Sequence, residues 1–155
     1  MGIFGPGYQA RGQLLGVAAV RDVKRVFVYS RSVEKRKAFS REMEDTLGVP
    51  VSPVENPREA VSGVDCVVTS TTAFEPVLQG SWLEKGTHVN AIGGNFLFKR
   101  EIDERAVMSA RIIAVESREQ SKIEAGELLP LVEKGRIQWR SLVELGEIVA
   151  GKATG

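Results

Sequence analysis

The sequence has few of the residues that form covalent cross-links and metal centres. Among its 155 residues there is one cysteine, Cys66, and one histidine, His88. A single cysteine excludes a disulfide within the chain, and without neighbouring cysteines or histidines it predicts no metal site. His88 has no carboxylate, serine or cysteine partner apparent in the sequence, so a structural role is favoured over catalysis.

The sequence also lacks an excess of charge and a long apolar run. Its formal net charge of +1 argues against a nucleic-acid surface, because such surfaces are strongly basic. No apolar run approaches the roughly 20 residues that a membrane-spanning helix needs, and the first residues lack the charged segment and apolar core of a signal peptide. With 43% apolar and 26% charged residues, we expect a cytoplasmic globular protein that binds neither nucleic acid nor membranes.

What the sequence does contain is a regular alternation of β-rich and helical stretches. Strands are predicted at residues 2–4, 25–30, 49–54, 65–71, 87–93 and 111–117, and helices at residues 8–20, 33–47, 56–63, 101–110 and 118–129. The two prolines of residues 49–54 favour a place near a sheet edge. Connections of this length are typical of βαβ units. We therefore predict an α/β fold, a doubly wound and mainly parallel sheet in one domain.

Two of the helices have recognisable ends or faces. Ser32 is the predicted N-cap of the second helix, and Gly48 is its predicted C-terminal stop. The first helix is expected to bury one apolar face, made of Leu14, Leu15, Ala18 and Ala19.

The stretch between the first strand and the first helix has the spacing of a dinucleotide-binding turn. Gly5 permits a tight turn, Gly7 lets a pyrophosphate approach the backbone, and the small Ala10 keeps the helix close to the strand. Pro6 stiffens the loop at the loss of one N–H donor. The start of the helix offers N–H groups and a partial positive charge to phosphates. The alternative is an ordinary strand-to-helix turn.

The end of the second strand indicates which dinucleotide is preferred. Sites that prefer NAD carry an Asp or Glu here, about 20 residues past the glycines, to bind the ribose 2′-hydroxyl. This chain has Ser30, Arg31 and Ser32 instead, followed by Lys35. Guanidinium and hydroxyl groups suit a 2′-phosphate, so we predict NADP(H) as the preferred cofactor, with NAD(H) possible. The alternative is a solvated basic helix face.

Polar residues also follow the fourth and fifth strands. Thr69, Ser70 and Thr71 close the fourth strand, where ligands of open parallel sheets bind; strand-end capping is the alternative. The fifth strand leads into paired glycines, after which Asn95 presents an amide and Lys99 lies one helical turn further on.

Five segments of the chain together resemble one protein family. In order they read GPGYQARGQL, VYSRS, VVTSTTAFEPVL, GTHVNAIGGN and VELGEIVAGK. Their order is similar to that in ornithine cyclodeaminases and the related mu-crystallin-type reductases, and the resemblance covers essentially the whole chain. It implies a Rossmann-type NAD(P)-binding domain of an enzyme that acts on small amino acids or imines.

The resemblance also implies roles for single residues. Tyr8 and Gln9 would lie at the pyrophosphate turn, and Ser30, Arg31 and Ser32 around the adenosine ribose. The residues implied to line the cofactor further along are Thr69, Asn90, Ala91, Ile92, Gly93 and Lys99.

Asn95 departs from the cyclodeaminase pattern, which has an aspartate thought to act as acid and base near the substrate nitrogen. An amide cannot exchange a proton in this way. Asn95 therefore favours imine reduction over cyclodeamination, and with Lys99 it is the candidate catalytic residue. An amide that only caps the following helix is the alternative.

The resemblance also predicts what lies outside residues 1–155. Family members have an N-terminal domain that binds substrate and forms the dimer, and this sequence is expected to lack it. We therefore expect residues 1–155 to form a dinucleotide-binding domain that binds cofactor with little turnover; a small amino-acid or imino-acid substrate belongs to an intact protein, and a homodimer is possible. The alternatives are a non-catalytic nucleotide-binding or interaction module and an inactive truncated homologue.

Overall fold

The structure, a computed structural model, describes residues 1–154. Within it the chain divides into two compact units. The first comprises Met1–Ala73 and Trp82–Gly93, and the second comprises Phe74–Ser81 together with the chain from Gly94 onward. Each unit has its own sheet and its own cluster of buried apolar side chains.

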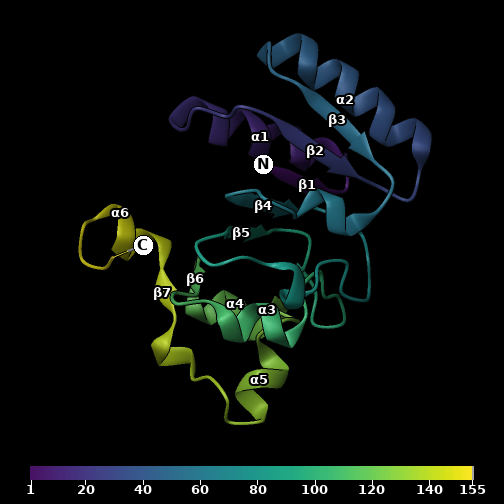
Figure 1. The fold of residues 1–155 in the computed structure, drawn as a ribbon. Coiled ribbons are helices and arrows are strands. Elements are labelled where there is room, and N and C mark those ends of the chain that lie inside the picture. Colours follow the sequence, from purple (N-terminus) through teal and green to yellow (C-terminus); the bar gives the residue numbers. More distant parts are fainter. Residues whose placement is uncertain (155) are drawn as a thin grey trace. The chain divides into compact units, whose positions relative to one another are not determined.

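The first unit is built on a five-stranded parallel sheet (Figure 1). Its strands are β1 (Gly2–Phe4), β2 (Val26–Tyr29), β3 (Val51–Val54), β4 (Cys66–Thr69) and β5 (His88–Ala91). They pair in the order β3-β2-β1-β4-β5, and every pair is parallel. The predicted α/β fold with a mainly parallel sheet is confirmed, and the proline-containing β3 lies at an edge as expected.

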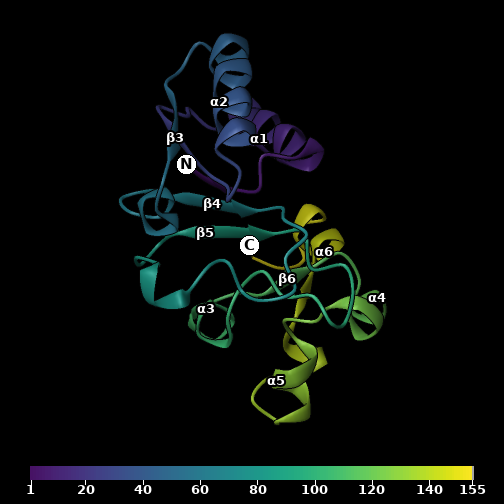
Figure 2. The ribbon, with the colours of Figure 1, turned by 90° about the vertical axis from the view of Figure 1, so that its right-hand side faces the viewer.

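Two long helices connect the first three strands. The helices α1 (Tyr8–Val20) and α2 (Val33–Leu47) lie side by side (Figure 2). The hydroxyl oxygen of Ser32 accepts a hydrogen bond of 3.2 Å from the Lys35 N–H, and Gly48 ends α2 with a φ of 67°. Both predicted ends of α2 are therefore confirmed. Between β3 and β4 the chain forms only a short 3₁₀ turn, η1 (Pro57–Ala60).

The buried face of α1 differs from the predicted one. Ala10 and Leu14 are fully buried and pack with Phe39 and the sheet residues in the core of the first unit. Leu15 is 44% exposed and Ala19 is exposed, so their predicted burial is wrong. Consecutive helix residues are rotated by about 100°, and burial of Ala10 at the first turn directs positions 10 and 14 inward and position 15 toward solvent.

The second unit differs from the predicted pattern at its strand. Residues 111–117 form only the short strand β6 (Ala114–Val115), which pairs in parallel with β7 (Val143–Glu144) in a separate two-stranded sheet. A strand spanning all of residues 111–117 is therefore wrong. The strand ends early because Ser117 is the N-cap of the next helix, its hydroxyl oxygen accepting the Gln120 N–H at 3.4 Å.

The helical part of the second unit is also more broken than predicted. Residues 118–129 form two helices, α4 (Arg118–Glu124) and α5 (Leu129–Glu133), since the backbone leaves the helical conformation at Ala125. The helix expected at residues 101–110 is α3 (Glu104–Ser109), and a last helix is α6 (Leu145–Val149). The unit's buried apolar cluster contains Val107, Leu128, Leu131 and Leu142.

The helix lengths and side-chain groupings of residues 1–154 bear on membrane and metal binding. No helix in this part of the chain has the length and apolar character needed to cross a membrane. The same residues contain no group of three or more His, Cys, Asp or Glu side chains placed to hold a metal ion.

Candidate functional site

Four strand ends of the first unit lie in one row. In the sheet register Phe4 pairs with both Tyr29 and Thr69, and Thr69 pairs with Ala91. The ladder continues one residue further through the Gly5 N–H to the Tyr29 carbonyl at 3.1 Å and the Ile92 N–H to the Thr69 carbonyl at 3.0 Å. The carboxyl ends of β2, β1, β4 and β5 are thus aligned, and the segments predicted to bind cofactor follow directly from them.

The two glycines of the turn after β1 are needed for different reasons. Gly5 has a φ of 87°, and a Cβ there would lie 2.7 Å from the Ser70 carbonyl oxygen and 2.8 Å from Cγ2 of Thr71. Gly7 is extended, with a φ of −93°, and a Cβ there would meet nothing within 4 Å. Gly5 therefore serves the fold, whereas the open space at Gly7 is room for a ligand to approach the backbone.

The carbonyl groups of this turn are held by neighbouring donors. The Gly7 N–H and the Ser70 hydroxyl both donate to the Gly5 carbonyl oxygen at 2.9 Å. The Arg11 guanidinium donates to the Gly7 carbonyl oxygen at 2.9 Å and to Glu42 of α2, and it lies 5.2 Å from the Phe39 ring centroid. No side chain among residues 1–154 caps the start of α1, so no side-chain acceptor in this part of the chain satisfies the first N–H groups of the helix.

The side chains at the start of α1 divide into an exposed pair and one buried residue. Tyr8 is 85% exposed and Gln9 is exposed, whereas Ala10 is fully buried against the sheet. Pro6 is half-buried within the turn. Ala10 thus has the close packing expected of the third small position of such a turn.

At the end of β2, the two serines are already engaged within the protein. The Ser32 N–H donates to the Ser30 hydroxyl oxygen at 3.2 Å, and the Ser32 hydroxyl donates to Glu34 at 3.0 Å. A backbone N–H and the Ser32 hydroxyl hold the pKa of Glu34 below its ordinary value. Arg31 and Lys35 are both exposed, so they are the cations that this strand end presents to solvent.

Arg36 belongs to the same basic segment but turns inward. It is 6% exposed, and it donates to the Ser30 carbonyl oxygen at 2.9 Å. Its second contact is an ion pair of 3.7 Å with Glu55. Arg36 therefore stabilises the end of β2 by bonding its backbone, a role that the basic residues in the sequence do not reveal.

The end of β5 is tied to α1 by a side-chain pair. The Asn90 amide donates to the Gln13 amide oxygen at 3.1 Å, and its own oxygen lies 2.8 Å from Nε2 of His88. His88 is exposed and has this structural contact. Gln13 was not anticipated, although its spacing of four residues from Gln9 places both glutamines on one face of α1.

The other residues predicted at the ends of β4 and β5 also lie at this edge. Thr69 is fully buried, and the Thr71 hydroxyl accepts the Ala73 N–H at 3.1 Å. Ala91 is exposed, and Ile92 and Gly93 are half-buried directly after the strand.

Asn95 and Lys99 lie in the second unit, in the loop of residues 94–101. Asn95 is exposed, and the Lys99 ammonium lies 4.9 Å from the ring centroid of Phe96. The Phe96 and Phe98 rings stack at 5.4 Å, and Phe98 stacks on Phe74 at 5.9 Å. The interpretation of Asn95 as a helix cap is wrong, because Asp103 is the N-cap of α3 and accepts the Ala106 N–H at 2.8 Å.

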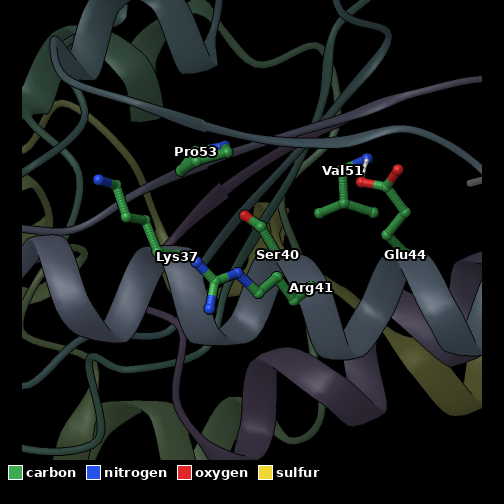
Figure 3. A pocket seen from close by; sticks show the side chains of 6 residues that line it. All are labelled: Lys37, Ser40, Arg41, Glu44, Val51 and Pro53. Carbon is green, nitrogen blue, oxygen red and sulfur yellow. Dashed lines mark hydrogen bonds between the residues drawn. The ribbon is translucent and has the colours of Figure 1, made fainter.

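A surface hollow of the first unit lies elsewhere on the sheet (Figure 3). Its lining residues, from α2 and from β3 at the sheet edge, are Lys37, Ser40, Arg41, Glu44, Val51 and Pro53. The Glu44 carboxylate accepts the Val51 N–H at 3.3 Å. None of the residues that line this hollow belongs to the aligned strand ends or to the loops that directly follow them.

The parallel strand order, with a glycine turn between β1 and α1, defines a Rossmann-type fold. The chain belongs to the ornithine cyclodeaminase/mu-crystallin family, whose sequence profile matches residues 1–155. The family predicted from the five ordered segments is thereby confirmed.

Similar proteins extend the comparison in sequence and in structure. A Δ(1)-pyrroline-2-carboxylate reductase of Bacillus thuringiensis is 37% identical over 154 residues, which are 99% of this chain and 47% of that protein. A solved Δ(1)-pyrroline-2-carboxylate reductase of Thermococcus litoralis, in complex with NADH and L-proline, is 37% identical with a TM-score of 0.93. An archaeal alanine dehydrogenase dimer with bound NAD is 35% identical with a TM-score of 0.88.

These matches cover nearly all of this chain but only about half of each solved chain. Both solved structures are matched over 99% of this chain, but the match covers 48% of the reductase chain and 47% of the dehydrogenase chain. This chain therefore spans about half the length of the relatives it resembles.

Proposed function

We propose that this chain binds a nicotinamide dinucleotide at the aligned ends of β1, β2, β4 and β5. The observation that carries the proposal is the turn after β1, in which Gly5 is fixed by Ser70 and Gly7 leaves open space before an uncapped helix. A pyrophosphate fits such a turn because backbone N–H groups and the helix dipole favour an anion there. The relatives solved with NADH and with NAD support the same assignment.

Within that proposal, the finer assignment is a preference for NADP(H) over NAD(H). Arg31 and Lys35 are exposed cations at the end of β2, and a guanidinium fork suits a 2′-phosphate. The serines contribute less than their sequence suggests, because Ser30 and Ser32 already bond within the protein and Glu34 lies beside Ser32. The preference therefore depends chiefly on Arg31.

Calorimetric titration of the chain with NADPH and with NADH tests both the binding of a dinucleotide and the preference for NADP(H). We expect measurable binding of either cofactor and tighter binding of NADPH. Arg31→Ala should weaken NADPH binding about tenfold, the loss of one charged hydrogen-bond partner, and change NADH binding by less than about twofold. Lys85→Ala, an exposed lysine in the loop before β5, is the matched control. Equal affinities, or unchanged NADPH affinity in Arg31→Ala, would remove the preference, and no binding of either cofactor would remove the function.

For the intact protein we infer imine reduction or amino-acid dehydrogenation of a small amino-acid or imino-acid substrate, rather than cyclodeamination. The dinucleotide would carry the hydride, while Asn95 can orient a substrate or water by hydrogen bonds but cannot exchange a proton. The pyrroline-2-carboxylate reductases and the alanine dehydrogenase among the relatives support this class. We expect the chain alone to bind cofactor with little turnover, since it spans about half the length of these enzymes.

We also propose a cytoplasmic location and a homodimer. The relative named as a dimer is the archaeal alanine dehydrogenase. Sedimentation of the purified chain would measure its own oligomeric state, and a monomer at all concentrations would contradict self-association through residues 1–155.

A further inference from the structure

The loop of residues 94–101 carries Asn95 and Lys99. Two residues between α4 and α5, Gly126 and Glu127, contact this loop. A Cβ on Gly126 would lie 2.3 Å from the Lys99 carbonyl oxygen and 2.8 Å from the Leu97 carbonyl oxygen. Arg100 donates from Nε to the Gly126 carbonyl oxygen at 3.1 Å. The loop backbone therefore lies directly against Gly126, at a distance that no side chain there permits.

The next residue, Glu127, contacts both ends of this loop with one carboxylate. Its Oε1 accepts the Glu101 N–H at 2.9 Å. At the other end, a Cβ on Gly94 would lie 2.2 Å from the same oxygen, so the carboxylate occupies the space that a side chain at position 94 would need. One group thus joins Gly94 and Glu101, which are the two residues that bound the loop.

The surroundings of this carboxylate raise its pKa above the ordinary value. Burial raises the pKa of Glu127, and the neighbouring Glu101 carboxylate adds to the rise. Two backbone N–H groups, of Glu101 and of Glu127 itself, and the Arg100 guanidinium oppose it. Glu101 and Arg100 are the charged groups that face Glu127, and Glu101 is itself fully buried.

We propose that Glu127 is a positioning residue, which holds the backbone of residues 94–101 and thereby the side chains of Asn95 and Lys99. It touches neither the cofactor nor the substrate in this assignment and acts through the Glu101 N–H and the contact with Gly94. The importance of Asn95 and Lys99 rests on the proposed function, whereas the hold on the loop does not.

Two substitutions separate the hydrogen bond from the charge. Glu127→Gln keeps an oxygen that accepts the Glu101 N–H and removes the titration, whereas Glu127→Ala removes both. Glu133→Ala and Glu133→Gln are matched controls, because Glu133 is an exposed glutamate on α5. Gly94→Ala tests the second contact, since its methyl group requires the carboxylate to move.

Backbone NMR of the full chain measures the loop directly. We expect the carboxyl carbon signal of Glu127 to titrate with a midpoint above the ordinary glutamate value of about 4.3. The Glu101 amide signal should show a step at the same midpoint, and this step should vanish in Glu127→Gln. Amide hydrogen exchange at Glu101 should accelerate at least about tenfold in Glu127→Ala, the loss of one charge-assisted hydrogen bond, and by much less in Glu127→Gln. A step at the Glu127 midpoint that persists in Glu127→Gln, or equal exchange in Glu127→Ala and the Glu133 controls, would overturn the proposal.

A dinucleotide titration then separates a positioning role from general stability. Glu127→Ala should weaken NADPH binding several-fold. In a protein that already carries Lys99→Ala, adding Glu127→Ala should weaken NADPH binding no further, because both substitutions remove the contribution of Lys99. Independent, additive losses would contradict positioning through the loop. If the unchanged chain binds neither NADPH nor NADH, the proposed function fails while the NMR result still decides the role of Glu127 in the loop.

Discussion

The Ser70 hydroxyl donates a hydrogen bond of 2.9 Å to the Gly5 carbonyl oxygen, across 65 residues of sequence. Ser70 also donates its backbone N–H to the Phe4 carbonyl oxygen at 2.9 Å. The loop after β4 therefore fixes the glycine turn after β1, and the two segments predicted separately to bind cofactor form one structural element.

Ser70→Ala should reduce the free energy of dinucleotide binding more than it reduces the free energy of unfolding. The substitution removes the hydroxyl contact and keeps the backbone contact, and a single hydrogen bond of this kind contributes about 0.5–1.5 kcal/mol. We expect a loss of affinity of about tenfold or less in calorimetry. Ser62→Ala, an exposed serine after η1, is the control, and an equal change in both variants would contradict the prediction.

Gly5→Ala and Gly7→Ala should fail in different ways. At Gly5 the φ of 87° and the contact with Ser70 at 2.7 Å penalise any side chain, so Gly5→Ala should lower the melting temperature, consistent with strain of about 1–3 kcal/mol. At Gly7 the backbone is extended and the space is open, so Gly7→Ala should melt near the unchanged protein and lose dinucleotide binding. Thermal unfolding together with calorimetry distinguishes the two, and normal binding by Gly7→Ala would show that no phosphate approaches this residue.

Acid should weaken the second unit through Glu104. A hydrogen bond from Lys134 lowers the pKa of Glu104, and Arg136 lies 3.4 Å from the same carboxylate. A lowered folded-state pKa contributes stability above the unfolded value of about 4.3, and this contribution is lost as pH falls through the folded value. Urea unfolding across the acid range should show a smaller pH dependence in Glu104→Gln than in the unchanged protein. Glu133→Gln should leave the dependence unchanged, and the same flattening in both variants would be the contrary result.

Cys66 should react slowly with thiol reagents in the folded protein. Burial raises the pKa of its thiol and Asp65 adds to the rise, while the Met1 ammonium opposes it. Because the thiolate is the reactive form, alkylation near pH 8 should be at least about tenfold slower than in the denatured chain. The rate should increase as pH rises above 9, the ordinary value of the thiol. Equal rates in the folded and denatured protein would contradict this.

Local signals explain which elements could be predicted. The boundaries of α2 follow from residues within one helical turn, because Ser32 bonds the Lys35 N–H and Gly48 adopts a positive φ. The break between α4 and α5 also has local signals that the predicted single helix overlooked, namely Gly126 before α5 and Pro130 in its first turn. What no local signal shows is that Gly126 packs against the carbonyl groups of residues 96, 97 and 99, a contact between segments far apart in the sequence.

The candidate site divides in the same way. The spacing of Gly5, Gly7 and Ala10 identified the turn, and the sequence also showed that basic residues follow β2. Which of those residues face solvent could not be predicted, since Arg36 turns inward to the Ser30 carbonyl while Arg31 does not. Long side chains of one charge look alike in sequence, and only their packed surroundings distinguish them.

By itself the sequence determined the family, the alternation of strands and helices, and the glycine turn, because these depend on residue types at short fixed spacings. Only the tertiary structure decided that Ser70 holds Gly5, that Asn90 bonds Gln13, and that Glu127 lies against Gly94. These contacts join residues that lie 65, 77 and 33 positions apart in the sequence. Such pairs are set by how the strands and loops pack, and no local pattern of residues encodes them.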